Sequence, residues 1–470
     1  MRRQVERELK LVPGEGFRLA DLGDPLSPPR VFVSTYHDTP DLRLAQHGIT
    51  FRHRVEDGTR LWQLKIPTGA FRIELEVPGP PAQPPDELTS LLAVHLRDQS
   101  LVKVARLRTR RQVVRRDGAE IVEDAVSVLE AQRVVRRFKE IEIELLDGDD
   151  GVLEQLERAV LDAGAEPGVF TPKLFRALDR TFESEPRAIE PGATPGQELG
   201  AALAEQHRAL LDHDPGTRLG ADPEDLHQMR VASRRARAFL RAARALVEPG
   251  WADGLRAELG WLGSALGPAR DADVLLEHLK EEIAALSEQG APARQLVAAL
   301  EEERDRARAA AVAALSDERY FTLLDRLQLA EQPQLLEGKT QTLADLWWKE
   351  FKRARRAFDA LDPDSGDDDL HAARIRAKRA RYAAELAAPE LGEAGAQFVD
   401  AAKTLQDVLG EHQDSVVAEA WILGHVAPNP ESAAAAVLLV EQQRERRRKA
   451  RKGWPKAWKR LARRARTAHA

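Results

Sequence analysis

The sequence predicts an α+β protein of more than one domain, in which a largely antiparallel sheet precedes an all-helical region. Two observations lead to this prediction. Up to about residue 182, apolar residues alternate with period two along short segments, as in strands. From about residue 198 they recur every three or four residues, as in helices. Residues 183–197 are rich in proline and glycine and read as a linker. The expected domains are therefore residues 1–182 and 198–470.

The first region has eight segments with strand-like alternation: 3–11, 30–37, 48–56, 59–67, 70–78, 101–115, 119–129 and 135–146. Tight hairpin turns are expected at Asp57-Gly58, Gly69 and Asp117-Gly118. Helical stretches are expected near 39–47, 86–96 and 150–164. Because short links join strand to strand, the sheet should be mostly antiparallel.

The helical region contains an internal repeat. The segment from His227 to Arg237 (HQMRVASRRAR) matches the segment from His371 to Arg381 (HAARIRAKRAR), 144 positions later. A second match, of the segment 266–271 with 409–414, follows at an offset of 143. Two motifs in the same order at nearly one offset indicate a duplicated helical unit. A period this long favours two related bundles over a solenoid of short repeats.

Composition excludes several classes of protein. Without cysteine the chain cannot form a disulfide scaffold or a cysteine-ligated metal site. With 71 basic and 77 acidic residues, the net charge of −6 argues against a generally basic coat for nucleic acid. The charged start and the short longest apolar stretch, residues 433–440, predict neither a signal peptide nor a membrane span. We therefore expect a cytoplasmic protein.

Charged residues occupy alternate positions of several predicted strands, which places them on one face of the sheet. They are Glu6, Glu8 and Lys10, then Arg52 and Arg54, Lys65, then Arg72, Glu74 and Glu76, then Arg106, Arg108 and Arg110, then Glu140, Glu142 and Glu144. A solvated face with cross-strand ion pairs would give the same pattern. The alternative is a closed or nearly closed barrel with a charged lumen. There, basic side chains would bind phosphates, and carboxylates would bind Mg²⁺ or Mn²⁺ between themselves and the ligand.

This region resembles the CYTH domains, the triphosphate tunnel metalloenzymes. Glu6-Arg-Glu8-Leu-Lys10 is similar to their ExExK signature, and the stretches 36–41 and 48–54 are similar to their YxDTxD and GxxLRxR motifs. Leu64-Lys65, Arg108-Thr-Arg110, residues 140–145 and Pro172-Lys173 follow in the same order. The resemblance implies an eight-stranded antiparallel β-barrel with peripheral helices, whose tunnel binds triphosphate compounds with a divalent metal.

The resemblance also implies roles for individual residues. Phosphates would be bound by Lys10, Arg52, Arg54, Lys65, Arg108, Arg110 and Lys173. Mg²⁺ or Mn²⁺ would be bound by Glu6, Glu8, Asp124, Glu142 and Glu144, and Glu76 would orient the attacking water. The expected activity is hydrolysis of a triphosphate compound, with inorganic triphosphate as the first candidate and thiamine triphosphate as another; a class of adenylate cyclase also belongs to the family.

Basic residues form a stripe along one face of each helical repeat. Steps of three and four separate His227, Arg230, Arg234, Arg237, Arg241 and Arg244, and likewise His371, Arg374, Lys378 and Arg381. Like charges stacked on one helix face are destabilising, so the stripe calls for a reason outside the helix. A solvated face paired with acids such as Asp271, Asp273 and Asp414 is one interpretation. The recurrence of the stripe behind a histidine in both copies favours the other, an anion-binding groove.

The helical region resembles the CHAD domain, the conserved histidine α-helical domain, over roughly residues 198–470. The repeated histidine motif, the ARDxDV stretch at 269–274 and LQDVLGEHQD at 405–414 are the matching features. The resemblance implies two pseudo-symmetric four-helix bundles with a groove for inorganic polyphosphate. The contacts would come from His227, Arg230, Arg234, Arg237, His371, Arg374, Lys378, Arg381 and His412. A metal role for the three histidines is disfavoured, because nearby arginines would repel a cation.

The C-terminal run from Arg444 to Arg466 contains 13 basic residues, one acidic residue and two tryptophans, Trp454 and Trp458. Such runs are solvated tails or nucleic-acid contacts in many proteins, and here the run is a candidate extension of the polyphosphate surface.

The expected partners are thus a triphosphate compound and inorganic polyphosphate, with association with polyphosphate granules as a further expectation and no membrane partner. Two rival functions are open. One is a non-catalytic polyphosphate-binding or targeting protein. The other is an RNA-binding protein, which the sparse aromatic residues disfavour because they leave few platforms for base stacking.

Overall fold

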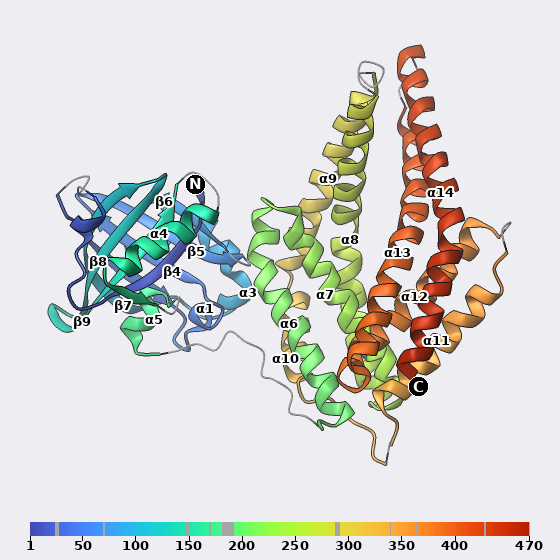
Figure 1. Ribbon diagram of the computed structural model, residues 1–470, viewed down its shortest axis with the longest axis horizontal. Coiled ribbons are helices and arrows are strands. Elements are labelled where there is room, and N and C mark those ends of the chain that lie inside the picture. The colour runs from blue at the N-terminus through green and yellow to red at the C-terminus, as the bar shows by residue number, and fades with distance from the viewer. Residues whose placement is uncertain are drawn as a thin grey trace. The chain divides into compact units, whose positions relative to one another are not determined.

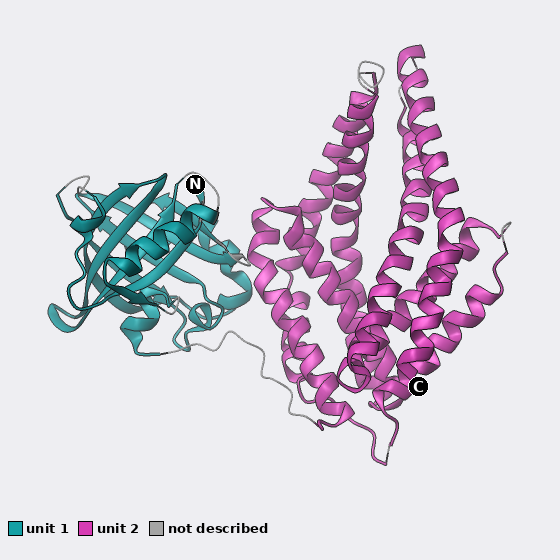
Figure 2. Ribbon diagram, viewed as in Figure 1, with its two compact units in different colours: residues 1–186 teal, residues 187–470 magenta. Residues whose placement is uncertain are grey.

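The computed structural model describes residues 1–23, 28–68, 71–146, 150–168, 171–180, 192–286, 292–338, 340–362, 365–426 and 429–469, without the side chains of residues 5, 6, 68, 71 and 150. The chain divides into two compact units, Met1–Pro186 and Arg187–Ala470 (Figure 2). Most of the expected linker, residues 183–191, lies outside the described residues. Its last residues are helical, because helix α6 begins at Pro195 behind a Thr194 cap.

The first unit is built on one antiparallel sheet of ten strands, in the order β1-β6-β5-β4-β3-β7-β8-β9-β2-β10 (Figure 1). The strands are β1 (Arg2–Glu6), β2 (Glu8–Pro13), β3 (Arg30–Asp38), β4 (Thr50–Glu56), β5 (Thr59–Thr68), β6 (Phe71–Pro78), β7 (Val102–Arg116), β8 (Ala119–Glu130), β9 (Arg133–Leu145) and β10 (Ala165–Pro167). All eight expected segments form strands. The count rises to ten because the first segment is divided at Arg7 and because a short strand, β10, is added.

The expected turns follow their chemistry. Asp57 and Gly58 have φ of 46° and 82°, and Asp117 and Gly118 have φ of 51° and 80°. Two successive positive φ angles are the signature of the two-residue hairpin turns that Asp-Gly favours. The third expected turn, at Gly69, lies outside the described residues.

The divided N-terminal strand contacts both sides of the strand order. β1 pairs with β6, whereas β2 pairs with β9. Among the described residues no pairing joins the two ends of the ten-strand order, so strand pairing does not close the sheet into the expected eight-stranded barrel. The connection between the two sides is the chain itself, at Arg7.

One face of the sheet is apolar and is covered by a helix. Leu11, Ile121 and Ile143 pack against Leu156 and neighbouring apolar residues of α4 (Asp150–Asp162), which lies across the strands in Figure 1. Burial of this kind stabilises by roughly 25 cal/mol per Å² of apolar surface. Lys10, Glu142 and the residues paired with them therefore belong to the other face of the sheet.

Short elements link the strands. They are η1 (Leu19–Leu22), α1 (Arg43–Gln46), α2 (Asp86–Thr89), η2 (Ser90–Leu92), α3 (Ala93–Leu96) and α5 (Lys173–Leu178). The sequence reading did not anticipate η1 or α5. In α5, Leu174 and Phe175 pack with Tyr36 and Leu107 of the sheet, and this contact holds Lys173 against the charged face.

The second unit is helical in its described part. Its helices are α6 (Pro195–Leu219), α7 (Pro223–Ala242), α8 (Pro249–Ala285), α9 (Arg294–Leu315), α10 (Glu318–Leu329), α11 (Leu343–Asp359), α12 (Asp367–Leu386), α13 (Ala388–His425) and α14 (Pro430–His469), with η3 (Ala243–Ala245) after α7. Asp222 caps α7, where its side chain accepts a hydrogen bond from the Glu224 backbone N–H. None of the described helices is long and apolar enough to span a bilayer.

The duplication is visible in the helices. α7 and α12 are both 20 residues long and begin 144 positions apart. Helices adjacent in the sequence pack on each other in both halves, and α7 packs against α12. The repeated basic motifs therefore meet where the two halves meet.

Candidate functional site

The signature loop after β3 has a structural role. The Asp38 carboxylate is buried and accepts hydrogen bonds from the backbone N–H groups of Thr39 at 2.7 Å, Leu44 at 2.9 Å and Ala45 at 2.9 Å. Thr39 in turn donates from its hydroxyl to Asp41 at 2.6 Å. These contacts satisfy free N–H groups at the start of α1. They fix the path of the chain between β3 and β4.

Strand register brings most of the expected residues onto one face of the sheet. Residues paired across neighbouring strands share a face. The pairs that carry the charges across the sheet are Lys65–Glu74, Gln63–Glu76, Arg52–Gln63, Asp124–Glu140, Val122–Glu142, Lys10–Glu142 and Glu8–Glu144. Glu6 lies on a β1 position paired with Arg72, but its side chain is outside the described residues.

At the centre of this face, basic groups lie among buried carboxylates. Lys173 Nζ is 3.0 Å from Asp124 Oδ2, 2.5 Å from Glu140 Oε1 and 2.8 Å from Glu142 Oε1. Lys10 Nζ donates to the same Glu142 oxygen at 2.6 Å. The side chains of both lysines are less than 10% exposed. Their charges therefore depend on the carboxylates rather than on water.

The pKa shifts follow from this pairing. Burial raises the pKa of Glu142, but the ammonium of Lys10 and the other nearby cations outweigh burial and hold that pKa well below its usual range. Burial lowers the pKa of Lys173, yet Glu142 and Asp124 raise it well above its ordinary value. Glu142 and Lys173 are therefore both charged at neutral pH.

A third cation in the cluster, Arg111, was not anticipated from the sequence. Its guanidinium donates to both oxygens of Asp124, at 2.9 and 2.7 Å, and to Glu142 Oε2 at 2.9 Å. Burial alone would lower its pKa, but Asp124 raises it well above the ordinary value. A bidentate guanidinium–carboxylate pair of this kind is a strong, directional interaction.

The expectation for Arg108 and Arg110 requires a correction. β7 pairs Arg111 with Asp124, so these two arginines lie on the opposite face and are exposed. On β7 the charged face carries Leu107, Thr109, Arg111, Val113 and Arg115. Of its two arginines, Arg111 pairs with Asp124, whereas Arg115 is opposed to Glu120. The sequence contained a signal for this register. The two-residue turn at Asp117-Gly118 pairs Arg116 with Ala119, and counting back along the hairpin opposes Asp124 to Arg111.

A second group of charged residues lies on strands β4 to β6. Arg52 donates to Gln63 at 2.8 Å and to the Tyr36 hydroxyl at 3.2 Å, and it lies 3.8 Å from Glu74. Lys65 Nζ lies 3.9 Å from the other Glu74 oxygen.

Arg54 and Glu76, also on this face, have other partners. The guanidinium of Arg54 pairs with Glu56 and lies over the Phe32 ring, 3.8 Å from its centroid. Glu76 accepts a hydrogen bond from Gln63 at 2.6 Å. Gln63 thus links Arg52 with Glu76, a connection that the charge pattern alone did not reveal.

The carboxylates suit a divalent cation. Asp124, Glu140 and Glu142 each offer an oxygen within 4.8 Å of the others, and so do Glu8, Glu142 and Glu144. Hard carboxylate oxygens are the ligands that Mg²⁺ and Mn²⁺ prefer. Because Glu142 belongs to both groups, two ions at these positions would share one bridging ligand. Of the expected ligands, Glu8, Asp124, Glu142 and Glu144 fit, and Glu140 joins them.

In the helical unit, the repeated Leu-Gly motif accommodates an arginine of the histidine-headed helix. Arg230 Nη1 donates to the carbonyl of Gly267 at 2.5 Å, and a Cβ at Gly267 would lie 3.2 Å from that nitrogen. In the second copy, a Cβ at Gly410 would lie 3.4 Å from Arg374 Nη2. Glycine in both copies therefore leaves room for the guanidinium against the neighbouring helix.

The basic stripes of α7 and α12 come together at Arg234, Arg374 and Lys378, which act electrostatically on one another. With Arg230 and Arg381 they make up what we call the α7/α12 groove, the predicted anion-binding surface; Arg230 also pairs with Asp271, and Arg381 with Glu385. Burial, together with the charges of Arg374 and Arg234, lowers the pKa of Lys378 to about 7. Burial also lowers the pKa of Arg374, with Arg234 acting in the same direction. The groove thus concentrates positive charge from both halves of the duplication. Arg237, on the same stripe, packs its guanidinium near Gly260 of α8.

The three histidines differ in their surroundings. His371 Nδ1 lies 2.7 Å from Gln413 Oε1, and the corresponding neighbour of His227 is Arg270, which helps burial to lower the pKa of that histidine. His412 is 2% exposed, and its Nε2 lies 3.1 Å from Asp367. Of the three, His412 is the one that the structure removes from the surface. None of them belongs to a possible metal-binding group in the described part of the chain.

The C-terminal basic run is largely engaged within the fold. Arg444 and Arg447 pair with Glu419, and Arg451 Nη2 lies 2.6 Å from Asp367. Trp458 stacks on Phe358 with 4.2 Å between ring centroids, and Trp454 is equally buried. The two tryptophans are therefore core residues of the α11–α14 contact rather than platforms for bases.

The chain thus combines an antiparallel sheet that has a mixed-charge face with a duplicated helical unit that has basic stripes. The chain belongs to the family in which a CYTH domain precedes a CHAD domain: the CYTH domain matches residues 4–177 and the CHAD domain residues 201–423. Uncharacterised proteins of Mycobacterium tuberculosis strains CDC 1551 / Oshkosh and H37Rv are each 33% identical to it over 439 residues, 84% of this chain and 82% of theirs.

Other similarities cover single domains. Thiamine-triphosphatase of Homo sapiens is 41% identical over 68 residues, which is 14% of this chain and 28% of that enzyme. Among solved structures, PptA from Streptomyces chartreusis has 24% identity and a TM-score of 0.49, over 57% of this chain and 100% of its own. The CHAD domain from Ricinus communis has 25% identity and a TM-score of 0.47, over 60% of this chain and 96% of its own.

Proposed function

We propose that the first unit hydrolyses a triphosphate compound, with inorganic triphosphate as the first candidate and Mg²⁺ or Mn²⁺ as cofactor, and that the second unit binds inorganic polyphosphate. The observation that carries the proposal is the buried cluster of Lys10, Lys173 and Arg111 with Asp124, Glu140 and Glu142. Buried ion pairs contribute little net stability, so a cluster this dense favours a role in binding.

Both signs of charge are needed for this chemistry. Phosphate oxygens would take over the hydrogen bonds that Lys10, Lys173 and Arg111 now donate to carboxylates, and the released carboxylates would bind the metal. A bound Mg²⁺ or Mn²⁺ supplies Lewis acidity and separates the carboxylates from the phosphate chain. Arg52 and Lys65 would hold the far end of the substrate. Glu76 remains the candidate for orienting water, with Gln63 fixing its carboxylate.

We further propose that the charged face lines a tunnel. The support is that β1 and β2, joined at Arg7, pair with strands from the two sides of the sheet order. Membership in the CYTH family supports a triphosphate substrate, as does the similarity to thiamine-triphosphatase, which is confined to 68 residues. An enclosed site would exclude water other than the reacting molecule.

A substrate panel tests the catalytic proposal. Purified full-length protein is incubated with inorganic triphosphate, thiamine triphosphate, ATP or long polyphosphate, with Mg²⁺, with Mn²⁺ or with EDTA, and phosphate release is measured. We expect metal-dependent release that is fastest from inorganic triphosphate. Release from none of the four substrates with either metal would leave the rival, a non-catalytic polyphosphate-binding protein.

The polyphosphate proposal rests on the α7/α12 groove, where Arg234, Arg374 and Lys378 form no hydrogen bond or ion pair with the described residues, while Arg230 pairs with Asp271 and Arg381 with Glu385. Binding of long polyphosphate to the full-length protein, measured by titration calorimetry at several salt concentrations, tests it. Since both polymers would bind through backbone charge, RNA is the required competitor. We expect polyphosphate to displace RNA, because the buried tryptophans offer no surface for base stacking.

A further inference from the structure

The two halves of the helical unit differ at one pair of equivalent positions. In the repeat, Arg235 corresponds to Arg379 and Glu385 corresponds to Arg241, at the common offset of 144. Arg235 of α7 pairs with Glu385 of α12, with 3.2 Å between Nε and Oε2. By symmetry, Arg379 of α12 should find an acid at position 241 of α7. It finds an arginine instead.

More arginines gather at this place than acids. Arg256 of α8, Arg353 of α11 and Arg376 of α12 act electrostatically on Arg241, and Glu350 opposes them. Glu350 is already bound by Arg353. Within the described part of the chain, Arg241, Arg376 and Arg379 form no hydrogen bond or ion pair. We call these three residues the Arg241 cluster.

Two observations show that the cluster is costly without a ligand. The Nε atoms of Arg241 and Arg256 are out of contact with solvent and have no hydrogen-bond partner. Burial lowers the pKa of Arg241 and of Arg379, and the neighbouring guanidinium groups add to the shift. A buried donor without an acceptor is unfavourable, and so are like charges held together. The cluster therefore has the features of a site that an anion completes.

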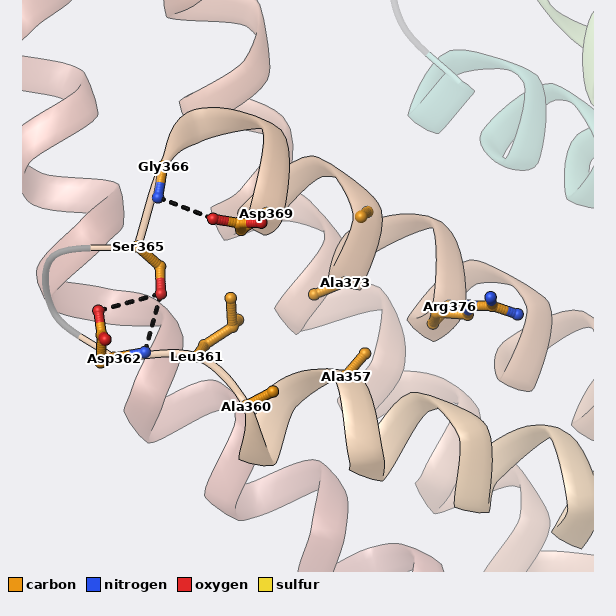
Figure 3. A pocket seen from close by; sticks show the side chains of 10 residues that line it. Ala357, Ala360, Leu361, Asp362, Ser365, Gly366, Asp369, Ala373 and Arg376 are labelled. Carbon is orange, nitrogen blue, oxygen red and sulfur yellow. Dashed lines mark hydrogen bonds between the residues drawn. The ribbon is translucent and has the colours of Figure 1, made fainter.

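On α12 the cluster lies on another face than the α7/α12 groove, whereas on α7 Arg241 continues the stripe of Arg234 about two turns further along. At about 100° of rotation per residue, Arg376 and Arg379 lie about 100° or more around α12 from Arg374 and Lys378. Arg376 instead lies at one end of a cavity of about 620 Å³ between α11 and α12 (Figure 3). Small side chains, Ala357 and Ala373 among them, leave the space open. A ligand can therefore reach this side of α12 without entering the groove.

We propose that the Arg241 cluster is a second anion site, which binds a phosphate group between α7, α11 and α12. Guanidinium groups bind phosphate oxygens through paired N–H donors, and the three arginines supply them from two helices. The ligand is either a free phosphate or a segment of a polyphosphate chain that also occupies the groove. The site itself does not depend on catalysis in the first unit.

The duplication supplies the test. Arg241→Glu rebuilds, with Arg379, the ion pair that Glu385 forms with Arg235. We expect a higher melting temperature of the helical unit without ligand, and about a tenfold loss of affinity for orthophosphate at this site, because a donor to a charged ligand is lost. Lys280→Gln, which changes a surface cation paired with Glu301, is the matched control and should leave the melting temperature response to orthophosphate unchanged; Lys378→Gln tests the groove separately. Glu385→Arg should create an additional phosphate site.

Each outcome of the calorimetric titration decides something. If Arg241→Glu loses orthophosphate binding but keeps the number of polyphosphate segments bound, the ligand is free phosphate. If both fall, the cluster belongs to a longer polyphosphate path. If Arg241→Glu changes neither orthophosphate binding nor polyphosphate binding, the proposal is overturned. A loss of polyphosphate affinity in Lys378→Gln alone concerns the groove and does not rescue the proposal.

Discussion

The buried ion-pair cluster of the sheet, which we call the sheet cluster, and the α7/α12 groove place opposite surroundings around their positive charges. In the sheet, Lys10, Lys173 and Arg111 are paired with carboxylates, and their pKa values lie above the ordinary ones although burial opposes this. In the groove, burial and like-charged neighbours lower the pKa values of Arg374 and Lys378. The cations of the sheet are neutralised within the protein. In the groove, Lys378 has more cationic than anionic neighbours, and an anionic ligand would balance this excess.

This difference has consequences for how each site would respond to a phosphate chain. A paired cluster has to exchange partners, so binding depends on something else that takes the released carboxylates, such as a divalent cation. In the groove, a bound anion reduces the repulsion between Lys378 and its cationic neighbours, so binding should stabilise the folded state directly. The sheet site should thus depend on metal, whereas the groove should depend on salt and pH.

The largest expected effect comes from the shared carboxylate of the sheet cluster. Glu142→Gln removes the charge that Lys10, Lys173 and Arg111 share. Phosphate release should fall at least about a hundredfold, and the free energy of unfolding of the first unit by about 3 kcal/mol, because buried cations lose their partner. Glu123→Gln, which alters a carboxylate paired with Lys139 at the surface, is the matched control. Equal activities of the two variants would contradict the assignment of the cluster.

Neighbouring arginines of β7 provide the next test, since they differ only in the face they occupy. Arg111→Gln should lower phosphate release by roughly ten- to a hundredfold, because one charge-assisted contact to phosphate is worth on the order of 1.5–3 kcal/mol. Arg110→Gln, on the opposite face, should stay within about twofold of the unmodified protein. The reverse ranking in a steady-state assay would show that the register of β7 does not define the site.

The groove should respond to pH through Lys378. Its pKa is lowered from 10.5 to about 7, so the folded protein holds fewer protons than the unfolded chain between these values. Without ligand, the free energy of unfolding gains from this group as the pH rises through that window. Polyphosphate favours the charged form, so its affinity should fall by up to about tenfold from pH 7 to 8.5. Calorimetry should find a flatter profile for Lys378→Arg, and an equally steep one would exclude Lys378 as the cause.

The smallest expected difference is between two histidines of the second copy. His371 is partly exposed beside Gln413, whereas His412 is buried beside Asp367. His371→Gln should weaken polyphosphate binding by a few fold with little change in melting temperature. His412→Gln should lower the melting temperature by several degrees and leave affinity within about twofold. If His412→Gln instead weakens binding without loss of stability, His412 contacts the ligand after all.

Much of the first unit could be read from its sequence because alternation and Asp-Gly turns report strands and hairpins directly. The charged face was identified from Glu142, Lys10 and Arg52, but β7 was misread by one position. That strand has arginines on both faces, so charge alone could not assign them. Only the register from the Asp117-Gly118 turn could have selected Arg111. Contacts made by α5 depend on tertiary packing and had no local signal beyond the Pro172-Lys173 motif.

In the second unit, the repeat predicted a duplicated helical unit, because two motifs recur in the same order at nearly one offset. It did not specify that α7 packs against α12. Neither helix alone carries a signal for the Arg241 cluster. The replacement of the acid Glu385 by Arg241 at the equivalent position appears only when the two copies are compared across the contact of α7 with α12. The burial of His412 and Trp458 depends on packing between helices distant in sequence, which periodicity does not specify.

The divided strand at the start of the chain has a consequence for biosynthesis. Glu8 pairs with Glu144, and Arg2 with Glu76, so residues a few positions apart await partners translated at very different times. The sheet cannot be completed until β9 has left the ribosome, and loop closure over such a separation is slow. Until then β2 is an exposed, unpaired edge, and nascent chains of this protein should depend on chaperones at that stage.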